Sequence, residues 1–168
     1  MYKKSEYTSA EKQKTAEWLF YLLSVVAVAF GAMYLFRGHI MPYHIAYLGM
    51  SESEIAAINP RLVALPVALM RVSGGTFIAV GVSAFLITLF SFRKGSVSAW
   101  WTLMTLFSIS LIPMFFVTVE IAMGVPKGEQ QPPWWLTLAM LAILAFALII
   151  SFIPSRYYDK VWKKNKNI

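Results

Sequence analysis

Four long stretches without a charged side chain constrain the fold of this chain more than any other feature. They cover residues 18–36, 72–92, 95–119 and 130–155. Each holds roughly 19 to 26 residues, and about 20 apolar residues are enough for a helix to cross the hydrocarbon core of a membrane. Charged residues make up 14% of the chain, whereas a soluble domain carries about 25%. The composition therefore excludes a soluble globular fold and a disordered chain.

We predict an all-α membrane protein with a single domain, a bundle of four transmembrane helices. Asn59-Pro60 is typical of a helix start, because proline lacks the N–H that the first helical turn leaves unpaired. Ser51 and Glu54 have the spacing of a capping box, which predicts a short extra helix over residues 52–58 in the first outer loop. The expected membrane helices cover residues 18–36, 60–91, 97–123 and 134–153. The expected polar tails cover residues 1–17 and 154–168.

The distribution of basic residues predicts the orientation in the membrane. Eleven of the 15 Lys and Arg residues lie in the two tails and in the turn between the second and third helices, whereas the other side holds Arg37, Arg61 and Lys127. The more basic side of a membrane protein faces the cytoplasm. We therefore expect both termini in the cytoplasm and a multi-pass protein of the inner or plasma membrane. Lysine-rich tails attract anionic membrane lipid, so the net charge of +7 requires no nucleic acid partner.

Arg71 and Glu120 are charges within otherwise apolar helices. Counted from the inner ends of their helices, Arg71 lies ~30 Å and Glu120 ~34 Å along the helix axis, near the outer boundary of the membrane. The two helices are joined by a short turn and are antiparallel neighbours, so an ion pair between these side chains is geometrically feasible. We interpret the pair as structural or as part of a ligand-binding site, because an ionisable residue at membrane depth is a functional candidate.

Gly75, Ala79 and Ser83 recur at four-residue spacing and line one side of the second membrane helix with small side chains. Such a stripe permits close contact between membrane helices. The sequence leaves open whether the contact is made within the chain or between copies. A homo-oligomer and a complex with a partner membrane subunit therefore both remain as hypotheses.

The first outer segment gathers polar side chains into a candidate pocket. They are His39, Tyr43, His44, Tyr47 and Arg61. Together with the two charges near the membrane boundary, they predict an outer-facing pocket that the short helix would cap. Two imidazoles and a nearby thioether could in principle hold copper. The spacing of the histidines fits no helical pair, so we predict loop and interface residues rather than a metal site.

The second membrane helix also carries a short recognisable pattern. Met70-Arg71-Val72-Ser73-Gly74-Gly75 is followed by Ala79 and Gly81. This pattern resembles the arginine-plus-glycine helix of small bacterial four-helix integral membrane proteins, including the DoxX-like group and related families without assigned function. The overall length and helix count are similar as well. Some members of that group are accessory subunits of quinone-linked oxidoreductases, so the resemblance implies that role as an alternative.

Missing residue types narrow the functional classes. The chain has no cysteine, which excludes a disulfide–quinone oxidoreductase and Cys-ligated metal centres. Both histidines lie in one outer segment, so a single chain cannot sandwich a haem within the membrane. No paired carboxylates, Ser-His-Asp set or HExxH sequence indicates hydrolytic catalysis.

We therefore predict a non-catalytic membrane protein whose outer-facing pocket binds a lipid, a quinone or a partner subunit. One alternative is an oligomeric transporter or channel subunit that uses Glu120 as its coupling carboxylate. A second is a membrane enzyme or redox subunit that uses Arg71, Glu120 and His44. The sequence does not identify a cofactor or a substrate.

Overall fold

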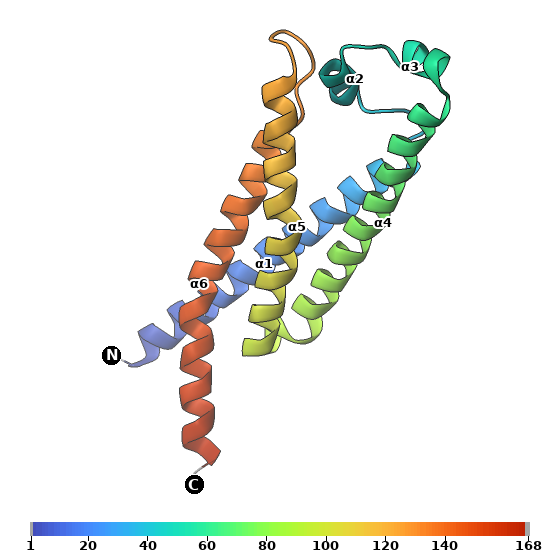
Figure 1. The fold of residues 1–168 in the computed structure, drawn as a ribbon. Helices are drawn as coiled ribbons and strands as arrows, with labels where there is room; N and C mark the ends of the chain where they lie inside the picture. The colour runs from blue at the N-terminus through green and yellow to red at the C-terminus, as the bar shows by residue number, and fades with distance from the viewer. Residues whose placement is uncertain (1, 167–168) are drawn as a thin grey trace.

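The computed structural model describes the backbone of residues 2–166 and the side chains of residues 11–152. This part of the chain is helical and contains no strand (Figure 1). The elements in chain order are α1 (Tyr2–Phe36), α2 (Pro42–Leu48), α3 (Glu52–Ile58), α4 (Arg61–Phe90), the 3-10 turn η1 (Phe92–Lys94), α5 (Val97–Gly124) and α6 (Trp134–Lys166). Four of these helices, α1, α4, α5 and α6, are long and apolar enough to cross a membrane. The predicted helical class is confirmed, as is the presence of four helices that are long and apolar enough to span a membrane.

The first and last helices are longer than predicted. α1 begins at Tyr2 rather than near residue 18, and α6 continues through Pro154 as far as Lys166. The predicted tails are therefore helical over most of their length, and residues 1 and 167–168 lie outside the described part. Propagating an existing helix avoids the cost of a new nucleus, and Lys, Glu and Gln are good helix formers. The helices consequently continue into polar sequence.

The short helix α3 has the bounds and the cap that its sequence predicts. The Ser51 backbone N–H donates to Glu54 Oε2 over 2.7 Å, and the Glu54 backbone N–H donates to Ser51 Oγ over 3.3 Å. This reciprocal pair is the capping box. At the start of α4, Asn59 Oδ1 accepts a hydrogen bond from the Arg61 backbone N–H over 3.0 Å, as expected of an N-cap.

The helix α2 is an element that sequence reasoning misses. Its first residue is Pro42, and Gly49 ends it with a φ of 64°, a left-handed conformation that favours glycine. Proline at the first position and glycine just after the last are recognised helix signals. The sequence therefore contains the evidence for this helix, within a segment that we expected to hold only one.

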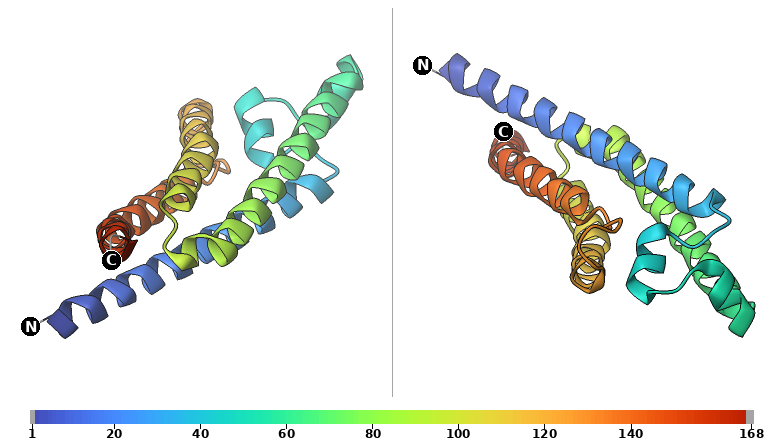
Figure 2. Two further views of the ribbon diagram at one scale, coloured as in Figure 1. Left: turned by 90° about the horizontal axis from the view of Figure 1, so that it is seen from below. Right: turned by 90° about the horizontal axis from the view of Figure 1, so that it is seen from above.

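The helices α1 and α4 make the most extensive contact in the bundle and lie side by side in both views of Figure 2. Their backbones meet at Gly31 and Gly74, where a Cβ added to either glycine would lie 2.6 Å from the carbonyl oxygen of the other. At Gly81 an added Cβ would lie 2.7 Å from the Ser24 carbonyl oxygen. Glycine at these positions therefore permits the close approach on which membrane helix packing depends.

The stripe predicted to pack α4, formed by Gly75, Ala79 and Ser83, does not pack within the chain. All three residues are exposed, and a Cβ added to Gly75 would have no heavy atom of another element within 4 Å. The contact with α1 uses Gly74 and Gly81 instead. Adjacent residues differ by about 100° around a helix, so a shift of one position changes the face. The four-residue spacing alone does not specify which face meets α1.

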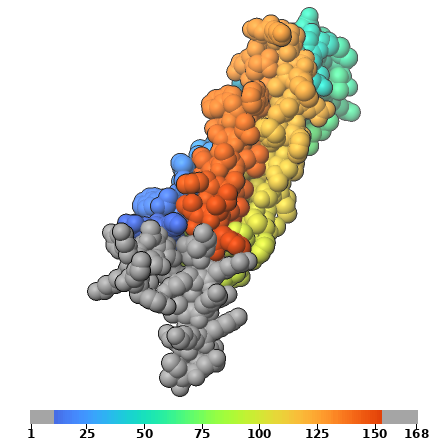
Figure 3. Space-filling view, turned by 90° about the vertical axis from the view of Figure 1, so that its left-hand side faces the viewer, coloured from blue at the N-terminus to red at the C-terminus, as the bar shows by residue number. Residues whose placement is uncertain are grey.

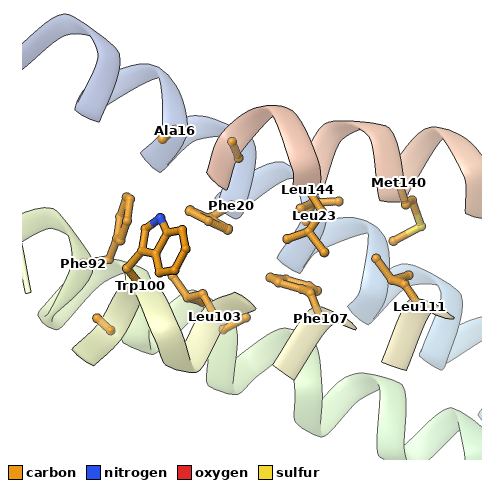
Figure 4. Close-up of a cluster of buried hydrophobic side chains, with 13 residues drawn as sticks. Ala16, Phe20, Leu23, Phe92, Trp100, Leu103, Phe107, Leu111, Met140 and Leu144 are labelled. Atoms are coloured by element: carbon orange, nitrogen blue, oxygen red, sulfur yellow. The ribbon is translucent and has the colours of Figure 1, made fainter. Parts of the chain in front are cut away.

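The largest buried cluster joins α1, α5 and α6 near the η1 turn, and Figure 4 shows its side chains. The Phe20 and Phe92 rings meet edge to face with centroids 4.9 Å apart. Trp100 Nε1 donates a hydrogen bond to Ser151 Oγ over 3.0 Å, which satisfies the indole N–H inside the cluster. These contacts attach α5 and α6 to the first half of α1.

Two polar contacts attach the η1 turn to α1. Gln13 Nε2 donates to the Phe92 carbonyl oxygen over 2.9 Å. Arg93 Nε lies 3.8 Å from Glu17 Oε1. Gln13 and Glu17 are one helical turn apart, so both face the same side of α1. The turn that connects α4 to α5 is therefore held against the first helix.

At the opposite end of the bundle, α4 and α5 separate, α2 lies between them, and α3 lies at the end of α4 (Figure 1). α2 contacts α5, and α3 contacts α4. On another face of the molecule α6 lies between α1 and α5 (Figure 3). The chain thus has one tightly packed end at η1 and one splayed end where the two short helices lie.

The contact at Gly74 leads to a testable prediction. Gly74→Ala should lower the free energy of unfolding by about 1–3 kcal/mol, because the added methyl group meets backbone atoms of α1 that cannot move aside. Thermal unfolding in detergent micelles, followed by tryptophan fluorescence, measures the effect. Gly75→Ala is the matched control and should leave the melting temperature unchanged or raise it slightly, since alanine is the better helix former. Equal losses in both variants would contradict the assigned α1–α4 contact.

Candidate functional site

A small buried cluster joins the splayed helices at the α2–α3 end. Met41, Tyr43 and Met70 form it, and Tyr34 and Ile121 pack against it. The Tyr34 and Tyr43 hydroxyl groups are 2.6 Å apart and share a hydrogen bond. Tyr43, which we predicted to line a pocket, is therefore a core residue that connects α2 to α1. The cluster holds α1, α2, α4 and α5 at one level of the bundle.

Arg37 is a residue of this region that the site prediction omits. Its Nε atom is buried and has no hydrogen-bond partner among the described residues. Burial is the main effect that raises the pKa of Tyr43, the neighbouring Tyr34 raises it further, and the charge of Arg37 opposes both. The Tyr43 hydroxyl therefore stays protonated and acts as a hydrogen-bonding group. The position of Arg37, directly after the first apolar stretch, is the sequence signal for it.

The two histidines of the outer segment have different partners. His39 is exposed, and its Nδ1 lies 3.2 Å from Glu52 Oε1. The other carboxylate oxygen of Glu52 accepts a hydrogen bond from the Ile40 backbone N–H over 3.3 Å, which attaches this loop to α3. His44 is half-buried, its ring meets that of Tyr43 edge to face, and burial lowers its pKa. Within the described residues no three His, Asp or Glu side chains converge as metal ligands.

The remaining predicted pocket residues lie at separate positions. The Tyr47 ring lies against Gly124 at the end of α5, where any Cβ would collide with it. Arg61 is exposed at the start of α4. The five predicted residues thus do not line one cavity, because α2 turns Tyr43 inward and Tyr47 toward α5, whereas His39 and Arg61 are exposed.

The structure of the single chain contains no ion pair between Arg71 and Glu120. Both side chains are exposed, and the contacts between opposite charges within the described residues are those of His39 with Glu52 and of Arg93 with Glu17. The neighbouring residues Met70 and Ile121 explain the outcome, because they face the buried cluster. The next position along a helix is rotated by about 100°. Arg71 and Glu120 are therefore directed to the outside of the bundle.

A cavity at this end lies elsewhere, between α5, the loop that follows it and the start of α6. Its volume is about 830 Å³. The walls are mainly apolar, and Lys127 and Gln131 contribute polar groups from the loop. Representative lining residues are Phe115, Val119, Ala122, Met123 and Trp134.

Sequence reasoning misses this open cavity because a loop, rather than a periodic pattern, forms one of its walls. The loop between α5 and α6 contains Gly128, which has a φ of 97°, and two prolines before Trp134. Lys127 has no carboxylate partner among the described residues. A lone lysine in a short loop beside a tryptophan pair is the signal that the sequence offers.

A second cavity of about 550 Å³ lies between α4 and α5. Thr76, Thr102 and Ser110 contribute hydroxyl groups to its lining. Each of these hydroxyls donates to a carbonyl oxygen of the preceding turn of its own helix, at 3.1, 2.8 and 2.9 Å respectively. The donor protons of these three hydroxyl groups are therefore already used, and Thr105 and Trp101 line the groove beside them.

The burial of His44 predicts a pH dependence of stability. Because burial lowers the pKa of His44 below its usual 6.5, the unfolded chain binds more protons than the folded one as the pH falls below that value. The contribution to stability is complete above about pH 6.5 and decreases toward the lowered pKa. Melting temperatures measured at pH 7.5 and pH 5 should fall more for the wild type than for His44→Gln. An equal decrease in both proteins would contradict this role.

Comparison of the chain with protein-family models, with curated protein sequences and with solved structures finds no match. The resemblance of the second membrane helix to the DoxX-like group therefore remains a prediction from one short pattern.

Proposed function

We propose that the chain is a multi-pass protein of the cell membrane, with both termini in the cytoplasm. In this orientation the α2–α3 segment and the loop between α5 and α6 lie on the outer side. The proposal rests on the distribution of basic residues, of which eleven lie in the tails and the η1 turn and three on the other side. Trp134 and Trp135 at the start of α6 agree with it, because tryptophan is enriched at the membrane interface.

We further propose that the protein is non-catalytic and binds an amphipathic small molecule, a lipid or a quinone, in the cavity beside α5. The observation that carries this proposal is the cavity itself, with a volume of about 830 Å³ and a mainly apolar lining. Ligand sites of about 300–1,000 Å³ with apolar walls and few polar groups are typical of small-molecule binding. An acyl or isoprenoid chain fits against Phe115, Val119 and Met123.

The polar end of such a ligand has partners at the cavity mouth. Lys127 supplies an unpaired ammonium group and Gln131 supplies an amide, both from the loop between α5 and α6. An ammonium group attracts a phosphate or a quinone oxygen, and the Trp134 indole suits the boundary between apolar and polar surroundings. The arrangement places apolar contacts along α5 and polar contacts in the loop.

The helix α2 contributes to this site indirectly. Tyr47 rests on Gly124, which lies between the lining residues Met123 and Val125. Contact with the tyrosine ring therefore fixes the position where α5 ends and the loop begins. Tyr47, which we first predicted to line a pocket, thus supports the loop that lines a different one.

The cavity proposal is tested by filling it. Ala122→Phe should reduce the affinity for a bound lipid or quinone roughly tenfold or more, a change of about 1.4 kcal/mol or more, because the added ring occupies the space beside α5. The measurement is the rise in melting temperature produced by phosphatidylglycerol and by decylubiquinone in detergent, together with mass spectrometry of molecules that co-purify. A wild-type chain that neither probe stabilises and that co-purifies with no apolar molecule would contradict the proposal.

The matched control is Ala142→Phe, which introduces the same ring at an exposed position of α6 outside the cavity. This variant should bind both probes as the wild type does. An equal loss in the control would show that the ring acts through general destabilisation. A preference for the quinone would favour the role of an accessory subunit of a quinone-linked enzyme, whereas a preference for the phospholipid would favour a lipid-binding protein.

The proposed orientation has its own test, which uses the absence of cysteine from the sequence. Glu129→Cys in the loop between α5 and α6 should react with an impermeant maleimide added outside intact cells. Lys94→Cys in the η1 turn should react only after the membrane is permeabilised. Labelling of both variants from the same side would contradict the topology.

A further inference from the structure

The surface of α4 that does not contact the rest of the chain carries a cation. Arg71 is exposed there, on the same helix face as Gly75 and Ala79. The surface of α5 carries Glu120, which is also exposed. Neither charge has an ionic partner among the described residues. A single chain therefore presents one unpaired cation and one unpaired anion on helices that are neighbours in the fold.

Both charges lie within apolar surface. Along α4, Leu69 is 58% exposed just before Arg71, and Val72 is 69% exposed just after it. Along α5, Phe116 is 66% exposed one turn before Glu120, and Met123 is 77% exposed one turn after it. The free-energy cost of an unpaired charge is greatest at the bilayer centre and smaller near the boundary, where these two residues lie. Pairing with an opposite charge removes the cost that remains.

The two charges also lie at the same level of the bundle. Met70 and Ile121, their immediate neighbours, pack against the same cluster of Met41 and Tyr43. A two-fold axis along the membrane normal preserves the level of every residue. In a dimer with this symmetry, Arg71 lies at the same height in the bilayer as the partner's Glu120. An isologous interface repeats every contact, so this pair occurs twice.

We propose that a second copy of the chain docks on this face and that Arg71 forms an ion pair with the partner's Glu120. The surface is complementary in charge to a second copy of itself, because Arg71 of each copy can pair with Glu120 of the other. This complementarity identifies a second copy of the chain as the partner. The small residues Gly75 and Ala79 on the helix face of Arg71 allow the helices to approach closely. The interface adjoins the ligand cavity, because Met123 contributes to both surfaces, but the pairing of Arg71 with Glu120 involves no residue that lines the cavity.

Charge reversal in trans tests the pairing. In a dimer of R71E chains each introduced carboxylate faces the partner's Glu120, and in a dimer of E120R chains each introduced guanidinium faces the partner's Arg71. Each variant alone should therefore dimerise roughly tenfold or more weakly than the wild type. A one-to-one mixture of the two variants contains only opposite charges across the interface and should recover dimers between the two kinds of chain.

The measurement is energy transfer between differently labelled copies reconstituted in phosphatidylcholine vesicles at several protein-to-lipid ratios. Circular dichroism of each variant shows that it is folded. Recovery in the mixture supports pairing between copies. Recovery only in the double variant R71E/E120R, and not in the mixture, would overturn the proposal, since the pair would then lie within one chain. Wild-type chains that remain monomeric at all ratios, with Arg71 bound to lipid headgroups, would overturn it as well.

A steric variant tests the same face without changing charge. Ala79→Leu should weaken the dimer, because the larger side chain separates the two copies of α4. The matched control is Ala145→Leu, at an exposed position of α6, which should dimerise as the wild type does. Unchanged dimerisation in Ala79→Leu would exclude this helix face from the interface.

Discussion

The fold depends on the direct backbone contact between α1 and α4. The lipid tails around the bundle are as apolar as the side chains that they contact. Membrane helices therefore gain little from hydrophobic burial and associate through close packing. Gly31, Gly74 and Gly81 make this possible, because their missing side chains bring carbonyl oxygens of one helix against the backbone of the other. The positions of α5 and α6 then follow from the aromatic cluster that packs onto α1. The orientation of the outward faces of α4 is set by the same contact.

Local sequence predicts the helices well because the signals for their ends are local. The capping box of Ser51 and Glu54 and the N-cap at Asn59 involve residues within three positions of each other. The helical extensions at both ends of the chain are not predicted in this way. They depend on propagation from a formed apolar helix, and hydropathy records only the apolar part. The choice between Gly74 and Gly75 as the contact residue depends on another helix and cannot be read from α4 alone.

In the candidate site, too, local sequence predicts some features, whereas others depend on contacts with other helices. The sequence correctly draws attention to the region after α1, since Tyr43 and Tyr47 both make contacts there that organise the structure. The sequence does not reveal that these side chains pack against other helices instead of lining a cavity, because the direction of each side chain depends on the position of α2. The cavity beside α5 requires a loop whose course is set by a glycine of positive φ and by prolines. Arg71 and Glu120 were placed at the same level by counting residues, and only their direction around the helix required the fold.

The pair of α1 and α4 is closed at both of its ends. At one end the α2–α3 segment joins the two helices covalently, and at the other the η1 turn that follows α4 is attached to α1 by Gln13 and Glu17. Two rods fastened at both ends resist the scissoring motion that rods fastened at one end permit. A rearrangement that widens the space between α4 and α5 is therefore carried by α5 rather than by the α1–α4 pair. The first and second membrane helices form the frame against which the aromatic cluster packs the other two.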